Sequence, residues 1–231
     1  MKNFLLTILL ACFCLSVSHA QTSQDNQYLS AKDSDPQAVK MLDALRKKYD
    51  AYQTLTADFR LELNFPGQQV EAQKGSISRQ GDNVRFKLGD QEGIINKEAA
   101  YIIQHGNKEV MINNLPEPGE MNGVLTPQTL FSFYEGDGYV AAITGTESVK
   151  GRQVQVVELK PVDRDASEFT KLRLLVDDAK KEIVTIKAFS RDGSSYTFHL
   201  DRTQANPTLA ASTFKFDQKA FPGYHVEDLR Y

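Results

Sequence analysis

The stretch from Leu55 to Phe65 reads LTADFRLELNF, and its side chains alternate between apolar and polar. Successive side chains of a β-strand point to opposite faces of its sheet, so this pattern predicts one long strand with an apolar face and a polar face. The apolar face carries Leu55, Ala57, Phe59, Leu61, Leu63 and Phe65. A sheet built around such a strand must cover this face or bind something against it.

The residues before this strand repeat with a helical period instead. Asp35 and Pro36 form a helix start, with a capping carboxylate followed by a proline at the first helical position. Apolar residues then recur at steps of three and four, at Val39, Leu42, Leu45, Tyr49 and Tyr52. This spacing predicts one amphipathic helix over residues 36–52.

Beyond Phe65, turn sequences recur at short intervals and separate runs of β-branched and aromatic residues. The turns include Pro66-Gly67, Gly81-Asp82-Asn83, Gly89-Asp90, Gly106-Asn107, Lys150-Gly151 and Asp192-Gly193. This pattern predicts a mainly β, α+β protein with an antiparallel meander. The last strand candidate is Phe214-Lys215-Phe216.

A second helix start interrupts the meander at Thr126-Pro127. It leads into large apolar residues and ends before Gly136, which predicts a helix of about two turns over residues 127–134. A helix this short is not stable alone in water. We therefore expect its aromatic side chains to rest on the sheet.

The N-terminus has the pattern of a secretory signal peptide over residues 1–20. A basic start at Lys2 is followed by an apolar run and by the exit Ser18-His19-Ala20. We expect a mature chain that starts at Gln21, with a flexible lead over residues 21–34 and a single domain over residues 35–231. This pattern predicts that the chain is exported across a membrane.

Both cysteines, Cys12 and Cys14, lie within the segment that we expect to be removed. The mature chain would then have no disulfide and no thiolate ligand. An alternative remains, because Leu9-Leu10-Ala11-Cys12 resembles a lipobox, which would make Cys12 an acylated N-terminus.

Neither the charge distribution nor the polar motifs indicate a nucleic-acid-binding surface, a metal site or a catalytic site. The formal net charge of the full chain is −3, and the mixed charges are not typical of a nucleic-acid-binding protein. We predict that the three mature histidines, His105, His199 and His225, do not form a metal site. We interpret Asp163-x-Asp165 and Asp177-Asp178 as turn caps rather than acid–base pairs. We predict no cofactor, no metal site, no catalytic residue and no enzymatic activity.

A meander without a second sheet has to curve or be covered. A curved sheet that forms an incomplete barrel, with the two helices over its mouth, would leave an apolar cavity. The alternative is an interior filled completely by its own side chains.

From Pro36 to Arg230 the chain resembles the periplasmic outer-membrane lipoprotein carrier proteins, the LolA-like family. The resemblance is carried by the run from Leu42 to Leu63, by Gly75-Ser-Ile-Ser-Arg with Val84-Arg-Phe, by Leu125-Thr-Pro, and by the ending Phe214-x-Phe with Gly223-x-x-Val226-x-Asp228. These are patterns of a fold rather than catalytic signatures.

The resemblance implies an incomplete antiparallel β-barrel with a helical lid, which carries the acyl chains of lipoproteins from the inner to the outer membrane. The implied partners are lipidated proteins, an inner-membrane lipoprotein-releasing ABC transporter and an outer-membrane acceptor, and we expect a monomer. We expect the acyl-chain cavity and lid to be lined by Phe59, Leu61, Leu63, Phe86, Tyr101, Ile103, Leu130, Phe131, Phe133, Tyr134 and Leu174.

Two features depart from the family pattern. An arginine that ties down the lid in well-studied carriers is replaced by Gln80, and strand alternation predicts that the adjacent Arg79 turns to the opposite face. The chain contains no tryptophan, and Phe86 stands where many relatives have one. A lipid-binding or lipid-sensing protein of the same fold, and a hydrolase with an unrecognised site, remain as alternatives.

Overall fold

A computed structural model describes residues 30–115 and 138–230. The predicted lid helix over residues 127–134 and the predicted signal peptide lie outside this described part. Helices and strands follow in the order η1 (Ala31–Asp33), α1 (Pro36–Asp50), β1 (Thr54–Asn64), β2 (Glu71–Gln80), β3 (Asn83–Leu88), β4 (Gln91–Ile95), β5 (Ala100–Gln104), β6 (Glu109–Asn113), β7 (Tyr139–Val149), β8 (Arg152–Pro161), β9 (Phe169–Asp177), β10 (Glu182–Ser190), β11 (Ser195–Ala205), η3 (Ala211–Phe214), η4 (Gln218–Ala220) and β12 (His225–Asp228).

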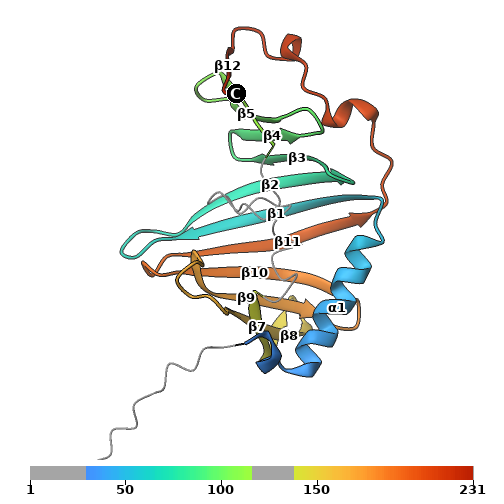
Figure 1. Cartoon of the computed structure of the whole chain (residues 1–231), viewed down its shortest axis with the longest axis vertical. Helices are drawn as coiled ribbons and strands as arrows, with labels where there is room; N and C mark the ends of the chain where they lie inside the picture. The colour runs from blue at the N-terminus through green and yellow to red at the C-terminus, as the bar shows by residue number, and fades with distance from the viewer. Residues whose placement is uncertain (1–29, 116–137, 231) are drawn as a thin grey trace, which may run out of the picture.

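The described strands form one curved, open sheet in the order β12-β6-β5-β4-β3-β2-β1-β11-β10-β9-β8-β7 (Figure 1). Two antiparallel meanders, β1 to β6 and β7 to β11, meet where β1 pairs with β11. The predicted antiparallel sheet that does not close into a barrel is therefore confirmed. Strand β12 is an exception to the antiparallel pattern, because it pairs with β6 in parallel.

Helix α1 begins as the sequence predicts. The Asp35 side chain accepts a hydrogen bond from the Gln37 backbone amide at 2.8 Å, and Pro36 occupies the first turn. The same residue ties the helix to edge strand β7, because the Asp35 amide donates to the Ala141 carbonyl at 2.8 Å. Figure 1 shows α1 beside the half of the sheet that contains β7 to β11.

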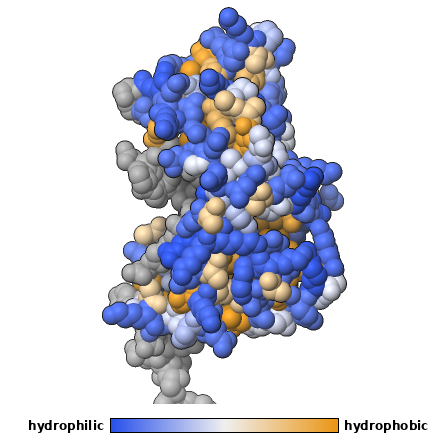
Figure 2. Space-filling model, turned by 90° about the vertical axis from the view of Figure 1, so that its right-hand side faces the viewer, coloured by the Kyte–Doolittle hydropathy of each residue, from blue (hydrophilic) through white to orange (hydrophobic). Residues whose placement is uncertain are grey.

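The sheet has two faces, which we name by their relation to this helix. The helix face carries the predicted apolar side chains of β1, and with α1 they form the largest buried cluster. The opposite face carries a smaller cluster around Ile94, Tyr101, Ile103 and Val110. Hydrophilic residues cover most of the side shown in Figure 2, and apolar residues are visible there in small separate groups.

The C-terminal segment covers the β4–β6 end of the opposite face. Phe216 stacks on Tyr101 with 4.6 Å between ring centroids, and Phe221 stacks on Phe216. The prediction of a strand at Phe214-Lys215-Phe216 is wrong, since Phe214 ends the 3-10 helix η3 and the last strand is β12. Phe214 and Phe216 alternate with Lys215 because the two aromatic side chains are buried or partly buried against the sheet. The backbone of this segment does not form a strand.

A buried carboxylate anchors this segment. Glu92 is 2% exposed and accepts a hydrogen bond from Nε of Arg85 at 2.6 Å. Arg85 also donates to the Thr213 carbonyl at 3.0 Å, which links the charge pair to the C-terminal segment. The desolvation cost of burying an ion pair is offset only when the other N–H groups of its arginine also find acceptors. The Thr213 carbonyl accepts from one of these groups of Arg85.

Two glycines on the helix face lie beneath aromatic rings. Phe59 is paired across the strands with Gly75, and Phe86 with Gly93. A Cβ added at Gly93 would overlap the Phe86 ring, and one added at Gly75 would overlap the Phe59 ring. The missing side chains let these rings lie close against the sheet.

Gly93→Ala should therefore destabilise the fold by about 1–3 kcal/mol, because the Phe86 ring has to move out of its packed position. Urea unfolding of the variant measures this loss. Gly138→Ala is the matched control, since an added Cβ meets nothing within 4 Å there. Equal stability of the two variants would contradict the close ring–glycine packing.

Candidate functional site

The helix face forms a continuous apolar floor that crosses several strands. One part is the cluster packed against α1, which includes Phe59, Leu61 and Leu174. A second cluster adjoins it on β1 to β3 and contains Ala57, Ile77, Val84 and Phe86. Cross-strand neighbours share a face, and the pairs Ala57–Ile77 and Ile77–Phe86 place both clusters on the helix face.

Part of this floor is only partly buried. The partly buried apolar side chains that pack against the two clusters on the helix-face strands include Leu63, Leu88, Ile95, Ile102, Tyr196 and Leu200. A fully packed core would bury such residues completely. Part of the apolar floor is therefore exposed.

The structure brings together five of the predicted cavity residues. Phe59, Leu61, Leu63, Phe86 and Leu174 all lie on the helix face. Four others, Leu130, Phe131, Phe133 and Tyr134, lie outside the described residues.

Tyr101 and Ile103 lie elsewhere. They belong to the cluster beneath the C-terminal segment, on the opposite face. The register accounts for this placement, because Phe86 pairs with Gly93 and Gly93 pairs with Ile102. Ile102, rather than its two neighbours, shares the face of Phe86.

Arg79 lies on the helix face, so the prediction that it turns away is wrong. It pairs with Leu55 on β1 and with Val84 on β3, both of which are buried on that face. Its Nη2 donates a hydrogen bond to the Tyr49 carbonyl at 2.9 Å. Arg79 thus holds the C-terminal turn of α1, where a cation also matches the negative end of the helix dipole.

Tyr49 holds the same turn from the helix side. Its side chain is buried among the cluster residues, and its hydroxyl accepts a hydrogen bond from the Ile183 amide at 3.3 Å. Burial raises the pKa of Tyr49 to about 12. Together, Arg79 and Tyr49 fix the end of α1 above the apolar floor.

The two aspartate pairs, Asp163-x-Asp165 and Asp177-Asp178, have the structural role that the sequence predicts. Asp163 accepts hydrogen bonds from the Asp165 and Ala166 amides, and Asp177 accepts one from Lys180. These contacts confirm both aspartate pairs as turn caps. Within residues 30–115 and 138–230 there is no cluster of three or more potential metal-ligating side chains, and no helix long and apolar enough to cross a membrane.

No protein-family model matches the chain, and no curated protein matches its sequence. Among solved structures, an uncharacterized conserved protein from Thermus thermophilus superposes with a TM-score of 0.54 at 8% identity, over 84% of this chain and 99% of that one. This likeness shows a shared fold.

Two further structures superpose with lower scores. A putative outer membrane lipoprotein-sorting protein domain from Vibrio parahaemolyticus has a TM-score of 0.43 at 14% identity, over 80% of this chain and 99% of that one. A LolA superfamily protein from Nitrosomonas europaea has a TM-score of 0.41 at 12% identity, over 78% of this chain and 98% of that one.

The raised pKa of Tyr49 predicts a specific pH dependence of stability. The unfolded chain releases this proton near pH 10 and the folded chain near pH 12, so the contribution is present below pH 10 and is lost as the pH rises toward 12. Wild type should lose about 2–3 kcal/mol relative to Tyr49→Phe over this interval. Urea unfolding of both proteins from pH 8 to pH 12 measures the difference, and parallel curves would contradict the buried phenol.

Proposed function

We propose that this protein is a periplasmic carrier that binds the acyl chains of lipoproteins and shuttles them from the inner to the outer membrane. The proposal rests on the sequence resemblance to the lipoprotein carriers and on the geometry of the helix face. The observation that carries it is the partly buried apolar floor on one face of an open sheet.

The floor suits an acyl chain for a physical reason. Burial of each methylene group is worth about 0.8 kcal/mol, so a lipoprotein anchor does not leave a membrane for water without a protein that shields it. The described side chains of the floor are aliphatic and aromatic, and they provide contact without fixed polar partners. Such contacts hold a chain and release it without a covalent step.

Arg79 gives the proposed carrier a way to hold α1 beside the floor. Its hydrogen bond to the Tyr49 carbonyl is one of several contacts at the end of the helix, beside the Tyr49 hydroxyl and the bonds from Lys48 to the Lys180 carbonyl and Glu182. A hydrogen bond to a charged group contributes about 1.5–3 kcal/mol. Burial of a few methylene groups of an acyl chain would offset the loss of this one bond.

The partners follow from the proposed route. An inner-membrane ABC transporter would supply the cargo together with the energy of its release, and an outer-membrane acceptor would receive it. The predicted signal peptide over residues 1–20 would export the chain, and we propose that it acts as a periplasmic monomer.

Leu63→Glu should weaken binding of a fluorescent fatty-acid probe at least tenfold, because a carboxylate in the floor disfavours burial of the chain. Asn64→Glu is the matched control, since Asn64 is the next residue of β1, is exposed and faces the other way. Unchanged probe binding in a folded Leu63→Glu protein would contradict the floor as the acyl site.

Native mass spectrometry of protein isolated from periplasm tests the cargo itself. The proposal predicts a bound acylated polypeptide. A bound free lipid would favour a lipid-binding or lipid-sensing role for the same floor, and would contradict the carrier role.

A further inference from the structure

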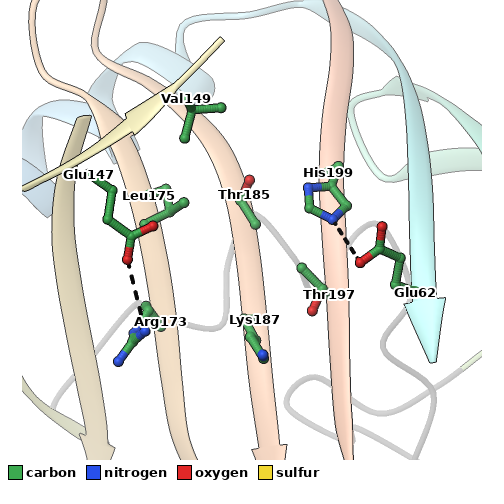
Figure 3. Close-up of a pocket in the computed structure, with 9 residues that line it drawn as sticks. All are labelled: Glu62, Glu147, Val149, Arg173, Leu175, Thr185, Lys187, Thr197 and His199. Carbon is green, nitrogen blue, oxygen red and sulfur yellow. Dashed lines mark ion pairs between the residues drawn. The ribbon is translucent and has the colours of Figure 1, made fainter. Parts of the chain in front are cut away.

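The opposite face of the sheet contains a cavity of about 410 Å³, within the range of small-molecule sites (Figure 3). It lies on the far side of the sheet from the acyl floor. Its lining comes from β1, β7, β9, β10 and β11 and consists of Glu62, Glu147, Val149, Arg173, Leu175, Thr185, Lys187, Thr197 and His199.

The base of the cavity consists of two rows of cross-strand neighbours. In one row Lys187 lies between Thr197 on β11 and Arg173 on β9. In the next row Thr185 lies between His199 and Leu175 on the same two strands. Directly paired side chains lie about 5 Å apart, so these groups form one compact polar surface with an apolar end.

Strand β7 supplies one wall. Its pairing with β8 shifts register between Ile143 and Gly145, and such an irregularity bends a strand. Beyond this bend, Glu147 and Val149 line the cavity. Figure 3 shows Glu147 directed toward Arg173, and their charged atoms lie 4.0 Å apart.

Among the described residues that line the cavity, one cation has no carboxylate partner. Lys187 and Arg173 are direct cross-strand neighbours, and like charges in this position repel. Glu158 neutralises Arg173 through a contact of 2.6 Å, and it also binds Lys171 at 3.0 Å. Although burial opposes ionisation of Glu158, the hydrogen bonds from Arg173 and Lys171 lower its pKa.

Lys187 has no carboxylate partner among the described residues. Its ammonium group lies 5.0 Å from the centroid of the Phe189 ring, which compensates only part of a positive charge. The nearby carboxylate of Glu62 lies 4.0 Å from Nε of Arg60 and 3.2 Å from Nε2 of His199. The charge of Lys187 is therefore available to a ligand.

Two hydroxyl groups lie beside this charge. Thr185 is 6% exposed and lines the cavity, and neither it nor Thr197 has a side-chain hydrogen bond within the described residues. Neither hydroxyl is a buried polar group that lacks a partner, so both are open to the cavity and can donate a hydrogen bond to a ligand.

We propose that this cavity is a second binding site, for a small ligand that carries an oxyanion, a carboxylate or a phosphate, on a short apolar group. Lys187 binds the oxyanion, and the hydroxyls of Thr185 and Thr197 donate hydrogen bonds to it. Val149 and Leu175 contact the apolar group. The site is independent of the acyl floor, from which the sheet separates it.

The test is a titration of the full mature protein with butyrate, butyl phosphate and butanol, followed by NMR chemical shifts. Both anions should bind saturably, with the largest shifts at Thr185, Thr197 and the residues beside them, and butanol should not. Lys187→Gln should weaken the anions at least tenfold. Lys74→Gln is the control, because Lys74 is an exposed residue of the same face outside the cavity lining.

Three results would overturn the proposal: absence of saturable anion binding, equal affinity in Lys187→Gln, or equal affinity for butanol. Loss of fatty-acid probe binding in the same variant would also overturn it, because the two sites would then not be separate. Vesicles of phosphatidylglycerol provide the second arm. If the protein binds these vesicles and Lys187→Gln abolishes that binding, the oxyanion of the ligand belongs to a lipid headgroup. If the protein binds only the soluble anions, the ligand is a free small molecule.

Discussion

One constraint organises this molecule: an open antiparallel sheet has an apolar face that cannot be left in water. Helix α1, the one α-helix of the described part, covers the face over β1 and the β7–β11 meander and forms the largest buried cluster with it. The same face continues beyond the helix over β1 to β5, where Ile77 and Phe86 are buried and Ile95 and Ile102 are partly buried. The function proposed for the protein arises from this incomplete cover.

Apolar packing holds helix α1 on the sheet, and polar contacts fix its two ends. At its start, the Asp35 amide pairs with edge strand β7 through the Ala141 carbonyl. At its end, Arg79 and the Ile183 amide hold Tyr49 through its carbonyl and its hydroxyl. The helix is thus fixed at both ends, while the floor beside it is built from apolar contacts that have no directional requirement.

Local pattern was enough to predict β1 and α1, because the strict alternation from Leu55 to Phe65 and the helical spacing from Val39 to Tyr49 each depend on neighbouring residues alone. It was not enough at Phe214-Lys215-Phe216, where the same alternation occurs without a strand. The face on which a residue lies depends instead on cross-strand register. Arg79, Tyr101 and Ile103 show this. Alternation within one strand placed Arg79 away from the helix face, and the sequence placed Tyr101 and Ile103 in one cavity with Phe86, although they lie on the opposite face. The cavity beside Lys187 was not foreseen, because its side chains come from five strands and each reads alone as part of a solvated face.

The central claim is that an acyl chain lies on the helix face. Methyl NMR of the protein with a spin-labelled fatty acid tests it most directly, since broadening reports which side chains lie near the label. The account predicts broadening of Leu63, Leu88, Ile102 and Leu200, all partly buried on that face. Broadening confined to Ile103 and Val110 on the opposite face, or no broadening at all, would contradict it.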